Sequence, residues 1–326
     1  AAPSLRPSEI VREQCRVPSV LTLLTSFTCL VETESTMSRT KSAIKQIRGL
    51  SMPFSTPEPF LFCVYHKDEY PAGDEKMQAP RRGNGADFNP TAKYRMYHGD
   101  RIPGFPQHPH RGFETITATI EGIIDHTDSL KNAGRYGHGD LQWMTAGKGI
   151  VHGEMFPLVH KDKPNPLRFF QIWINLPKKN KMVPADYIMH WAEEIRKLDS
   201  EDKKTKITVW AGELKDAKGL PPPVNSWAAD PKNDVAIWHV SLEQGAKYTL
   251  PPAKGGSDVN RVLYYIEGKQ LHVEGKKMDP RVRIDVNPAL PVELSVPKGA
   301  PGPSEILMLQ GKPIGEPVVQ HGPFVM

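Results

Sequence analysis

A chain of 326 residues has the length of two domains, at roughly 100 to 200 residues per domain. Its formal net charge of +5 is small and spread along the chain, so it does not indicate direct binding to DNA or RNA. Three cysteines without a CxxC pair support neither a disulfide framework nor a thiolate metal site. They favour a reducing compartment, the cytoplasm or alternatively the nucleus. The longest apolar stretch, residues 17–31, is too short for a membrane span.

The first 51 residues are expected to lie outside the fold, as a disordered extension or a leader. Met37 opens a plausible translation start, MSRTKSAIKQIRGL, so residues 1–36 could be a leader that is removed. Glu9 and Glu13 stand where a secretory signal would be basic, and no small-residue cleavage site follows the apolar stretch. Targeting to an organelle therefore stays open as the less favoured alternative.

From residue 60 onward the sequence predicts short strands separated by many turns, in keeping with its 32 prolines and 26 glycines. One helix is expected at residues 185–198, ADYIMHWAEEIRKL, because the apolar positions follow helical spacing and Pro184 stands at the start. The charge run at residues 201–206 predicts a solvated loop. The strands are expected at residues 60–66, 115–120, 142–145, 169–176, 236–242, 261–266 and 305–309.

The two halves of the chain show weak sequence similarity to each other, as internal repeats would. TITATIEG, residues 115–122, aligns with NRVLYYIEG, residues 260–268, at the Glu-Gly pair that ends each predicted strand. WMTAGKG in the first half has a looser counterpart, SVPKG, in the second. We therefore expect an all-β protein of two tandem β-barrels with few short helices, in residues 52–184 and 185–326.

His108 and His110 stand two residues apart in a stretch expected to be extended. Because side chains alternate along a strand, both imidazoles would point to the same face. The same register continues through Glu114, Ile116 and Ala118 and puts the intervening threonines on the opposite face. The histidines are therefore expected on the apolar, inward side.

His152 and Glu154 repeat this spacing, and their face also carries Ile150 and Phe156. Four such side chains would cost several kcal/mol to bury without partners, because a buried carboxylate must protonate or find a counter-charge. A divalent cation removes that cost. Either pair alone would suit hydrogen-bonded core or surface residues, but an HxH pair followed by an HxE pair predicts one metal site formed by both.

Three imidazoles and one carboxylate suit Fe(II), Mn(II), Ni(II), Cu(II) and Zn(II), and affinity order alone does not select iron. On an octahedral ion, four protein ligands leave two open positions, which suits a substrate oxygen beside O2. A zinc ion with four protein ligands would be closed, which suits a structural role better.

Two segments, HPHRGFETITATIEG and GDLQWMTAGKGIVHGEM, resemble the pirin family, and the C-terminal PIGEPVVQHGPFVM is similar to the family's ending. The resemblance covers about residues 52–326. It implies two cupin barrels, of the double-stranded β-helix or jelly-roll type, packed together. It also implies Fe(II), held in the first cupin by His108, His110, His152 and Glu154.

The resemblance further implies that the second cupin has lost its metal ligands. Carrying His108 and His110 across the internal repeat lands on Lys254 and Gly256, which agrees with that loss. The extension before residue 52 is not part of the family's pattern, and family members usually continue beyond the PFVM segment.

For function, the resemblance implies a quercetin 2,3-dioxygenase-type oxygenase, which opens a flavonol ring with O2 and releases carbon monoxide. A small aromatic enol or flavonol and O2 would then be the partners of a monomeric enzyme, with Glu154 as the catalytic base for the substrate's hydroxyl proton. Phe156, Trp143 and Met155 are candidate neighbours of the substrate or plain core residues. The alternatives are a non-enzymatic, iron- and redox-sensing transcriptional coregulator with a protein partner, and a cupin that handles sugars or small acids.

Overall fold

The computed structural model describes residues 42–83 and 85–326, and in these ranges the protein is built from β-strands. The expectation of an all-β protein with few short helices is confirmed. Helical turns in the described ranges are 3-10 segments of three residues each: η1 (Lys178–Asn180), η2 (Trp227–Ala229), η3 (Pro231–Asn233) and η4 (Gly256–Asp258).

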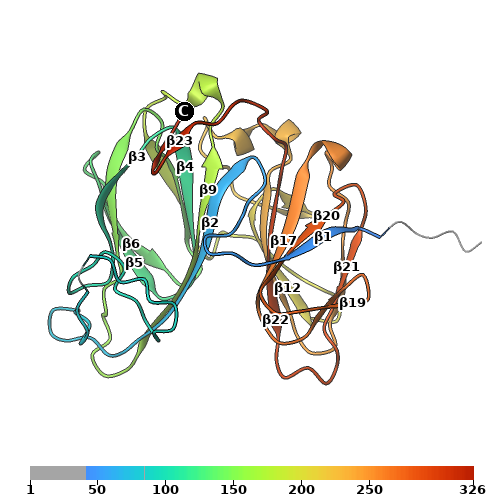
Figure 1. Cartoon of the computed structure of the whole chain (residues 1–326), viewed down its shortest axis with the longest axis horizontal. Coiled ribbons are helices and arrows are strands. Elements are labelled where there is room, and N and C mark those ends of the chain that lie inside the picture. The colour runs from blue at the N-terminus through green and yellow to red at the C-terminus, as the bar shows by residue number, and fades with distance from the viewer. Residues whose placement is uncertain (1–41, 84) are drawn as a thin grey trace, which may run out of the picture. The chain divides into compact units, whose positions relative to one another are not determined.

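Two sheets form the first barrel, drawn in blue to green in Figure 1. The larger has the order β10-β7-β4-β9-β2, with β10 (Asp186–His190), β7 (Leu141–Thr145), β4 (Phe113–Glu121), β9 (Asn165–Asn175) and β2 (Phe60–Tyr70). The smaller has the order β3-β8-β5-β6, with β3 (Gly104–His110), β8 (Ile150–Met155), β5 (Ile123–Asp128) and β6 (Ala133–Gly137).

The second barrel also has two sheets. Its larger sheet contains, in order, β1 (Ile44–Gly49), β20 (Val282–Val286), β17 (Asn260–Glu267), β22 (Ser304–Gly311), β15 (Ala236–Leu242), β12 (Thr205–Ala211) and β11 (Lys197–Asp199). Its smaller sheet contains β16 (Lys247–Leu250), β21 (Val292–Ser295), β18 (Leu271–Val273) and β19 (Lys276–Met278). Two short hairpins complete the strands: β13 (Glu213–Leu214) with β14 (Ala217–Lys218), and β23 (Gln320–His321) with β24 (Phe324–Val325).

Both barrels follow one topology, as the sequence repeat predicts. The order β7-β4-β9-β2 matches β20-β17-β22-β15, and the order β3-β8-β5-β6 matches β16-β21-β18-β19. The aligned sequence segments form β4 and β17, which occupy equivalent places. The fold is therefore a pair of cupin barrels.

Strand β4 is buried on both of its faces. One face carries Ile116 and Ala118, which join a core cluster shared with Tyr264 of the second barrel. The other face carries Thr117, whose hydroxyl donates to Glu154 of the opposite sheet at 2.8 Å. The expectation that the apolar residues of β4 share a face with the histidines is therefore wrong.

The reason is a change of sheet between β3 and β4. The chain leaves one sheet at His110 and enters the other at Phe113, so Arg111 and Gly112 form the crossing. Gly112 has a φ of +83°, in the left-handed region that favours glycine. Such a crossing interrupts the period-two register on which the prediction depended.

The helix expected at residues 185–198 is also wrong. Strand β10 pairs with β7, β11 pairs with β12, and between them a single turn forms, in which Ile195 N donates to Trp191 O at 3.1 Å. The edges of both sheets offer backbone hydrogen bonds to partners that are distant in sequence. This pairing overrides the local helical spacing.

Three segments cross the boundaries expected from the sequence. Strand β1 falls within the expected extension, residues 1–51, but pairs with β20 of the second barrel. Strand β10 follows the boundary at residue 184 but belongs to the first barrel, and the C-terminal hairpin (β23–β24) bonds to Arg111. Residues 1–36, the predicted leader, lie outside the described residues. Within the described ranges, no helix has the length and apolar character needed to cross a membrane.

Candidate metal centre

The predicted ligands lie on two paired strands of the first barrel. In the β3–β8 pair, the Cα of His108 is opposite that of His152, and the Cα of Phe105 is opposite that of Glu154. Residues directly opposite each other in an antiparallel pair point to the same face. The two period-two pairs therefore face the same interior, as the sequence predicts, although the residues of β4 do not continue their register.

Three imidazoles, those of His108, His110 and His152, have ligand atoms within 4.8 Å of one another. Their ring centroids are 4.7 Å apart for His108–His110, 4.5 Å for His108–His152 and 4.9 Å for His110–His152. With metal–nitrogen bonds of about 2.1 Å, ligands at right angles place imidazole centroids roughly 4.5 Å apart, and tetrahedral ligands about 5.2 Å apart. The two distances from His108 are closer to adjacent positions of an octahedral ion, whereas the His110–His152 distance lies between the two geometries.

The protonation state of these rings also suits a metal. Burial and the neighbouring histidines lower the pKa of His110 to about 2 and hold that of His152 well below its usual range. Both ring nitrogens of each are buried without a hydrogen-bond partner. His108 is half-buried, and its Nδ1 lies 2.8 Å from Pro106 O, which leaves Nε2 unused. Neutral imidazoles with unused lone pairs are the form that binds divalent ions.

Glu154 is buried beside the histidines, but its carboxylate is not part of their group. Its Oε1 accepts hydrogen bonds from Thr117 Oγ1 at 2.8 Å and from the Tyr136 hydroxyl at 3.2 Å. Its Oε2 accepts one from Gln171 Nε2 at 2.9 Å. The structure thus brings three of the four predicted ligands together, and ligation by Glu154 stays a prediction.

The sequence analysis missed the residues that surround this group. The partners of Glu154 come from three different strands and have no common spacing that a sequence could show. His126 was also missed, although its ring centroid lies only 5.5 Å from that of His152. With Asp128 it forms another period-two pair on β5, so the signal was present in the segment HTD.

Aromatic rings lie on two sides of the histidines. The ring of Phe105 is 6.4 Å from that of His108, and the rings of Phe113 and Trp173 are 5.3 Å and 5.4 Å from that of His110. Flat rings on both sides of a metal group would suit a flat, aromatic ligand.

The three predicted substrate neighbours lie in different places. Phe156 is buried, and its ring is 6.1 Å from that of Phe105, on the side of the histidines. Trp143 belongs to the core cluster shared by the two barrels and donates to Glu114 at 3.2 Å. Met155 is half-buried at the end of β8. The core interpretation therefore fits Trp143.

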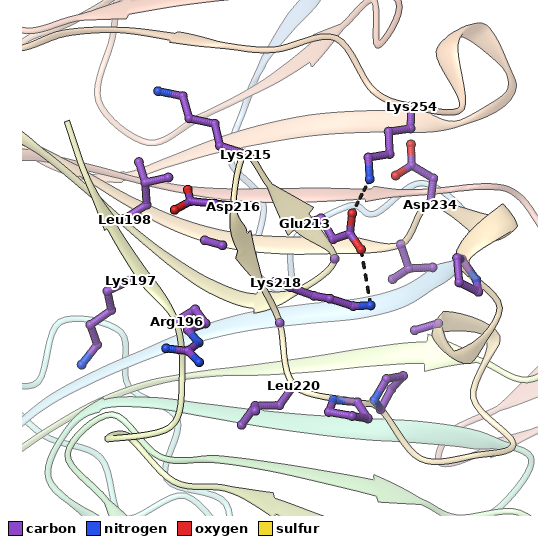
Figure 2. Close-up of a pocket in the computed structure, with 18 of the residues that line it drawn as sticks. Arg196, Lys197, Leu198, Glu213, Lys215, Asp216, Lys218, Leu220, Asp234 and Lys254 are labelled. Atoms are coloured by element: carbon purple, nitrogen blue, oxygen red, sulfur yellow. Dashed lines mark hydrogen bonds and ion pairs between the residues drawn. The ribbon is translucent and has the colours of Figure 1, made fainter. Parts of the chain in front are cut away.

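A cavity of about 990 Å³ lies on the second barrel, next to the β13–β14 hairpin (Figure 2). Figure 2 shows Glu213 in this cavity between Lys218 and Lys254, with an ion pair to each. None of the three clustered histidines lines this cavity, nor a smaller one of about 330 Å³ near His138 and His160. Neither cavity belongs to the candidate metal centre.

The second barrel has apolar side chains where the first has its histidines. The β16–β21 pair is equivalent to β3–β8, and its core positions include Tyr248, Leu250 and Leu294. Lys254, which the sequence alignment equated with His108, lies outside this core and is exposed. The interior of the second barrel is therefore apolar at the strands equivalent to β3 and β8, and Lys254 is not part of that interior.

A pair of cupin barrels, one carrying a group of three clustered histidines, defines a bicupin with a candidate metal centre. The chain belongs to the pirin family. The pirin family model matches residues 58–174, and the model of the pirin C-terminal cupin domain matches residues 237–326.

Relatives with assigned names agree with this membership. The chain is 38% identical over 229 residues to a Pseudomonas aeruginosa protein named "putative quercetin 2,3-dioxygenase", an alignment that covers 70% of this chain and 75% of that protein. It is 35% identical over 244 residues to pirin of Rattus norvegicus, and this alignment covers 73% of this chain and 77% of that protein. A crystal structure of quercetin 2,3-dioxygenase from Acinetobacter baumannii matches 87% of this chain and 90% of its own, with a TM-score of 0.65 and 25% identity.

Proposed function

We propose that this protein is a metal-dependent oxygenase of the quercetin 2,3-dioxygenase type, with iron(II) held by His108, His110, His152 and Glu154. The observation that carries the proposal is the grouping of three imidazoles, with ligand atoms within 4.8 Å of one another, on one side of a position that an ion could occupy. Two of the similar proteins carry the name of this activity. Manganese, nickel, copper and zinc are the alternative ions, because these ligand types do not select among them.

The proposed substrate is a small aromatic enol such as a flavonol. The rings of Phe105 and Phe113 lie beside His108 and His110 in edge-type contacts, and aromatic surroundings of this kind favour a flat aromatic molecule. A divalent ion with three neutral histidines and one carboxylate keeps a net positive charge, which favours the substrate's anionic form. When bound, the metal would supply the redox chemistry with O2.

Glu154 is proposed to take the hydroxyl proton of the substrate as the catalytic base. The side chains of Thr117, Tyr136 and Gln171 hold its carboxylate in place through the hydrogen bonds given above. These contacts fix the orientation of the carboxylate toward the interior that the histidines share. Ligation and proton transfer by Glu154 are separable, because only ligation affects metal binding directly.

The experiment that tests the proposal is anaerobic loading with Fe(II), followed by addition of a flavonol and O2. Wild-type protein should consume the flavonol and release carbon monoxide, and His110→Ala should lose both metal and activity. Glu154→Gln should lose metal if Glu154 is a ligand, or keep metal with kcat lower by about 100-fold or more if it is only the base. His138→Ala, at an exposed histidine, is the control. Iron-loaded wild type that releases no carbon monoxide contradicts the oxygenase proposal.

A second candidate function is a metal-sensing regulator that binds a protein partner. The observation that favours it is the C-terminal hairpin, whose exposed apolar residues Val319, Phe324 and Met326 lie on a segment bonded to Arg111, next to His110. Oxidation of Fe(II) to Fe(III) would add one charge in a low-dielectric interior, and the hairpin is bonded to the residue that follows His110. Hydrogen exchange of the hairpin amides should then differ between the two oxidation states. Equal exchange contradicts this candidate.

A further inference from the structure

We propose that His126 and Asp128 form a positioning pair that orients His152 as a metal ligand. The proposal rests on the metal binding proposed above and gives a role to a buried histidine which that chemistry does not use. The three residues lie on the neighbouring strands β5 and β8, where the Cα of Asp128 is opposite that of His152 and the Cα of His126 is opposite that of Glu154. All of them therefore point to one face of the sheet.

Asp128 sets the tautomer of His126. Its side chain is fully buried, and its Oδ1 accepts hydrogen bonds from Leu130 N at 2.8 Å and Asn132 N at 3.1 Å. A buried carboxyl group with several donors of this kind is held as the anion. His126 Nε2 lies 3.1 Å from Asp128 Oδ2, so Nε2 must carry the proton and donate it. In the neutral imidazole the other nitrogen, Nδ1, is then an acceptor without a proton.

His126 Nδ1 and the ring nitrogens of His152 face the same interior. Nδ1 of His126 is buried without a hydrogen-bond partner, and so are both ring nitrogens of His152. Leaving such polar atoms unpaired in the interior costs roughly 1–3 kcal/mol each. The two ring centroids are 5.5 Å apart. An N–H···N hydrogen bond of about 2.9 Å between imidazoles places centroids roughly 5.2 Å apart, so a small rotation would pair the two atoms.

Metal binding explains why His152 would need a hydrogen bond to His126. A histidine that binds a metal through one nitrogen keeps a proton on the other, and that N–H needs an acceptor. His126 Nδ1 is suited to be the acceptor for His152, just as Pro106 O lies 2.8 Å from His108 Nδ1. Tyr187 of β10 packs against the His126 ring, with 5.6 Å between the two ring centroids.

The experiment measures cobalt(II) affinity by chelator competition for wild type, His126→Leu and His126→Gln. His126→Leu should bind 10- to 100-fold more weakly, which is the usual effect of losing such a partner. His126→Gln should recover most of the affinity, because its amide nitrogen can donate to Asp128 while its oxygen accepts from His152. His190→Leu is the matched control, since His190 is also buried, has an unpartnered Nδ1 and lies outside the clustered histidines.

A second measurement needs no metal: nitrogen-15 shifts of the imidazoles in the metal-free protein should show His126 protonated at Nε2. An Nδ1–H tautomer overturns the proposal, and this result decides it even if His126→Leu fails to fold. Wild-type affinity in a folded His126→Leu variant overturns the positioning pair alone. Failure of wild type to bind cobalt at all overturns the metal centre and the pair together.

Discussion

Glu114 is a fully buried carboxyl group that lies between the two barrels rather than in the metal centre. Its oxygens accept hydrogen bonds from Thr145 Oγ1 at 2.6 Å, Trp143 Nε1 at 3.2 Å and the hydroxyl of Ser226. Burial raises the pKa of Glu114 to about 7, although these hydrogen bonds lower it. The residue is therefore a candidate for pH-dependent stability that is independent of any metal.

We predict that Glu114→Gln reduces the pH dependence of stability between about pH 5 and about pH 8. The pKa of Glu114 is about 7 in the folded protein, against 4.5 for the usual glutamate, so the folded state holds the proton more tightly. Its contribution is complete below pH 4.5 and is lost as the pH rises through 7. Urea unfolding at both pH values measures this. Parallel pH profiles for variant and wild type would show the prediction to be wrong, and Glu201→Gln, at an exposed site, should leave the profile unchanged.

At the scale of elements, the crossing between β3 and β4 determines where the histidine pair ends. Gly112 N donates to Gly147 O at 2.8 Å, and Gly112 O accepts from Lys181 Nζ at 2.9 Å. Val325 N, from the C-terminal hairpin, donates to Arg111 O at 2.9 Å. Three separate segments therefore hold the two residues that connect the sheets.

We predict that Gly112→Ala destabilises the protein by about 2–3 kcal/mol. A Cβ at this position would lie 1.8 Å from Val325 O, and the φ of +83° is itself unfavourable for alanine. The free energy of unfolding in urea measures the effect. Gly299→Ala is the control, because a Cβ there meets no atom within 4 Å, and it should change stability by less than about 0.5 kcal/mol. Similar stabilities for the two variants would contradict the prediction.

Strands such as β2, β4, β15 and β17 could be predicted from apolar patterns and from the repeat. Others, such as β12, β16 and β20, fall outside the ranges that the sequence predicts. The segment that forms β10 could not be predicted, because Tyr187 and Ile188 fit helical and extended spacing alike. The segment becomes a strand because the edge of β7 offers it backbone hydrogen bonds. The candidate site was likewise predictable only in part. The pairs HxH and HxE can be recognised in the sequence, whereas the partners of Glu154 cannot.

For the whole molecule, a half-buried cluster of polar side chains links the barrels. Arg168 of β9 and His239 of β15 each lie 2.8 Å from Glu305 Oε2 of β22. Burial alone would raise the pKa of Glu305, but the hydrogen bonds and charges of His239 and Arg168 hold it at about 2. A second link, between Lys67 and Glu267 at 3.0 Å, is more exposed.

We predict that Glu305→Gln costs about 3 kcal/mol at neutral pH, because it leaves the half-buried Arg168 without its counter-charge. The depressed pKa means that the stabilisation is present above pH 4.5 and is lost as the pH falls through 2. The difference from wild type should therefore narrow in acid, as measured by thermal unfolding at several pH values. Glu267→Gln, the same change in the exposed pair, should cost less than about 1 kcal/mol. Equal costs for the two variants would refute the prediction.

The C-terminal hairpin should also affect the proposed metal centre, although it lies more than 200 residues from His110 in the sequence. Val325 is fully buried against the crossing, so Val325→Asp should displace Arg111 and weaken metal binding by about tenfold or more. Chelator competition measures this. Val319→Asp, on the same hairpin at a side chain that is 69% exposed, should bind like wild type. Unchanged affinity in Val325→Asp would separate the hairpin from the site.

The sequence by itself determined the all-β fold, the repeat of two barrels and the two pairs of candidate ligands, because period-two spacing and internal alignment are local or repeated signals. The tertiary structure alone decided which face of β4 meets the site, what holds Glu154 and that His126 lies beside His152. It also decided that the two ends of the described chain pack on opposite barrels. These features depend on hydrogen bonds between residues such as Thr117 and Glu154, 37 positions apart, which no local pattern encodes.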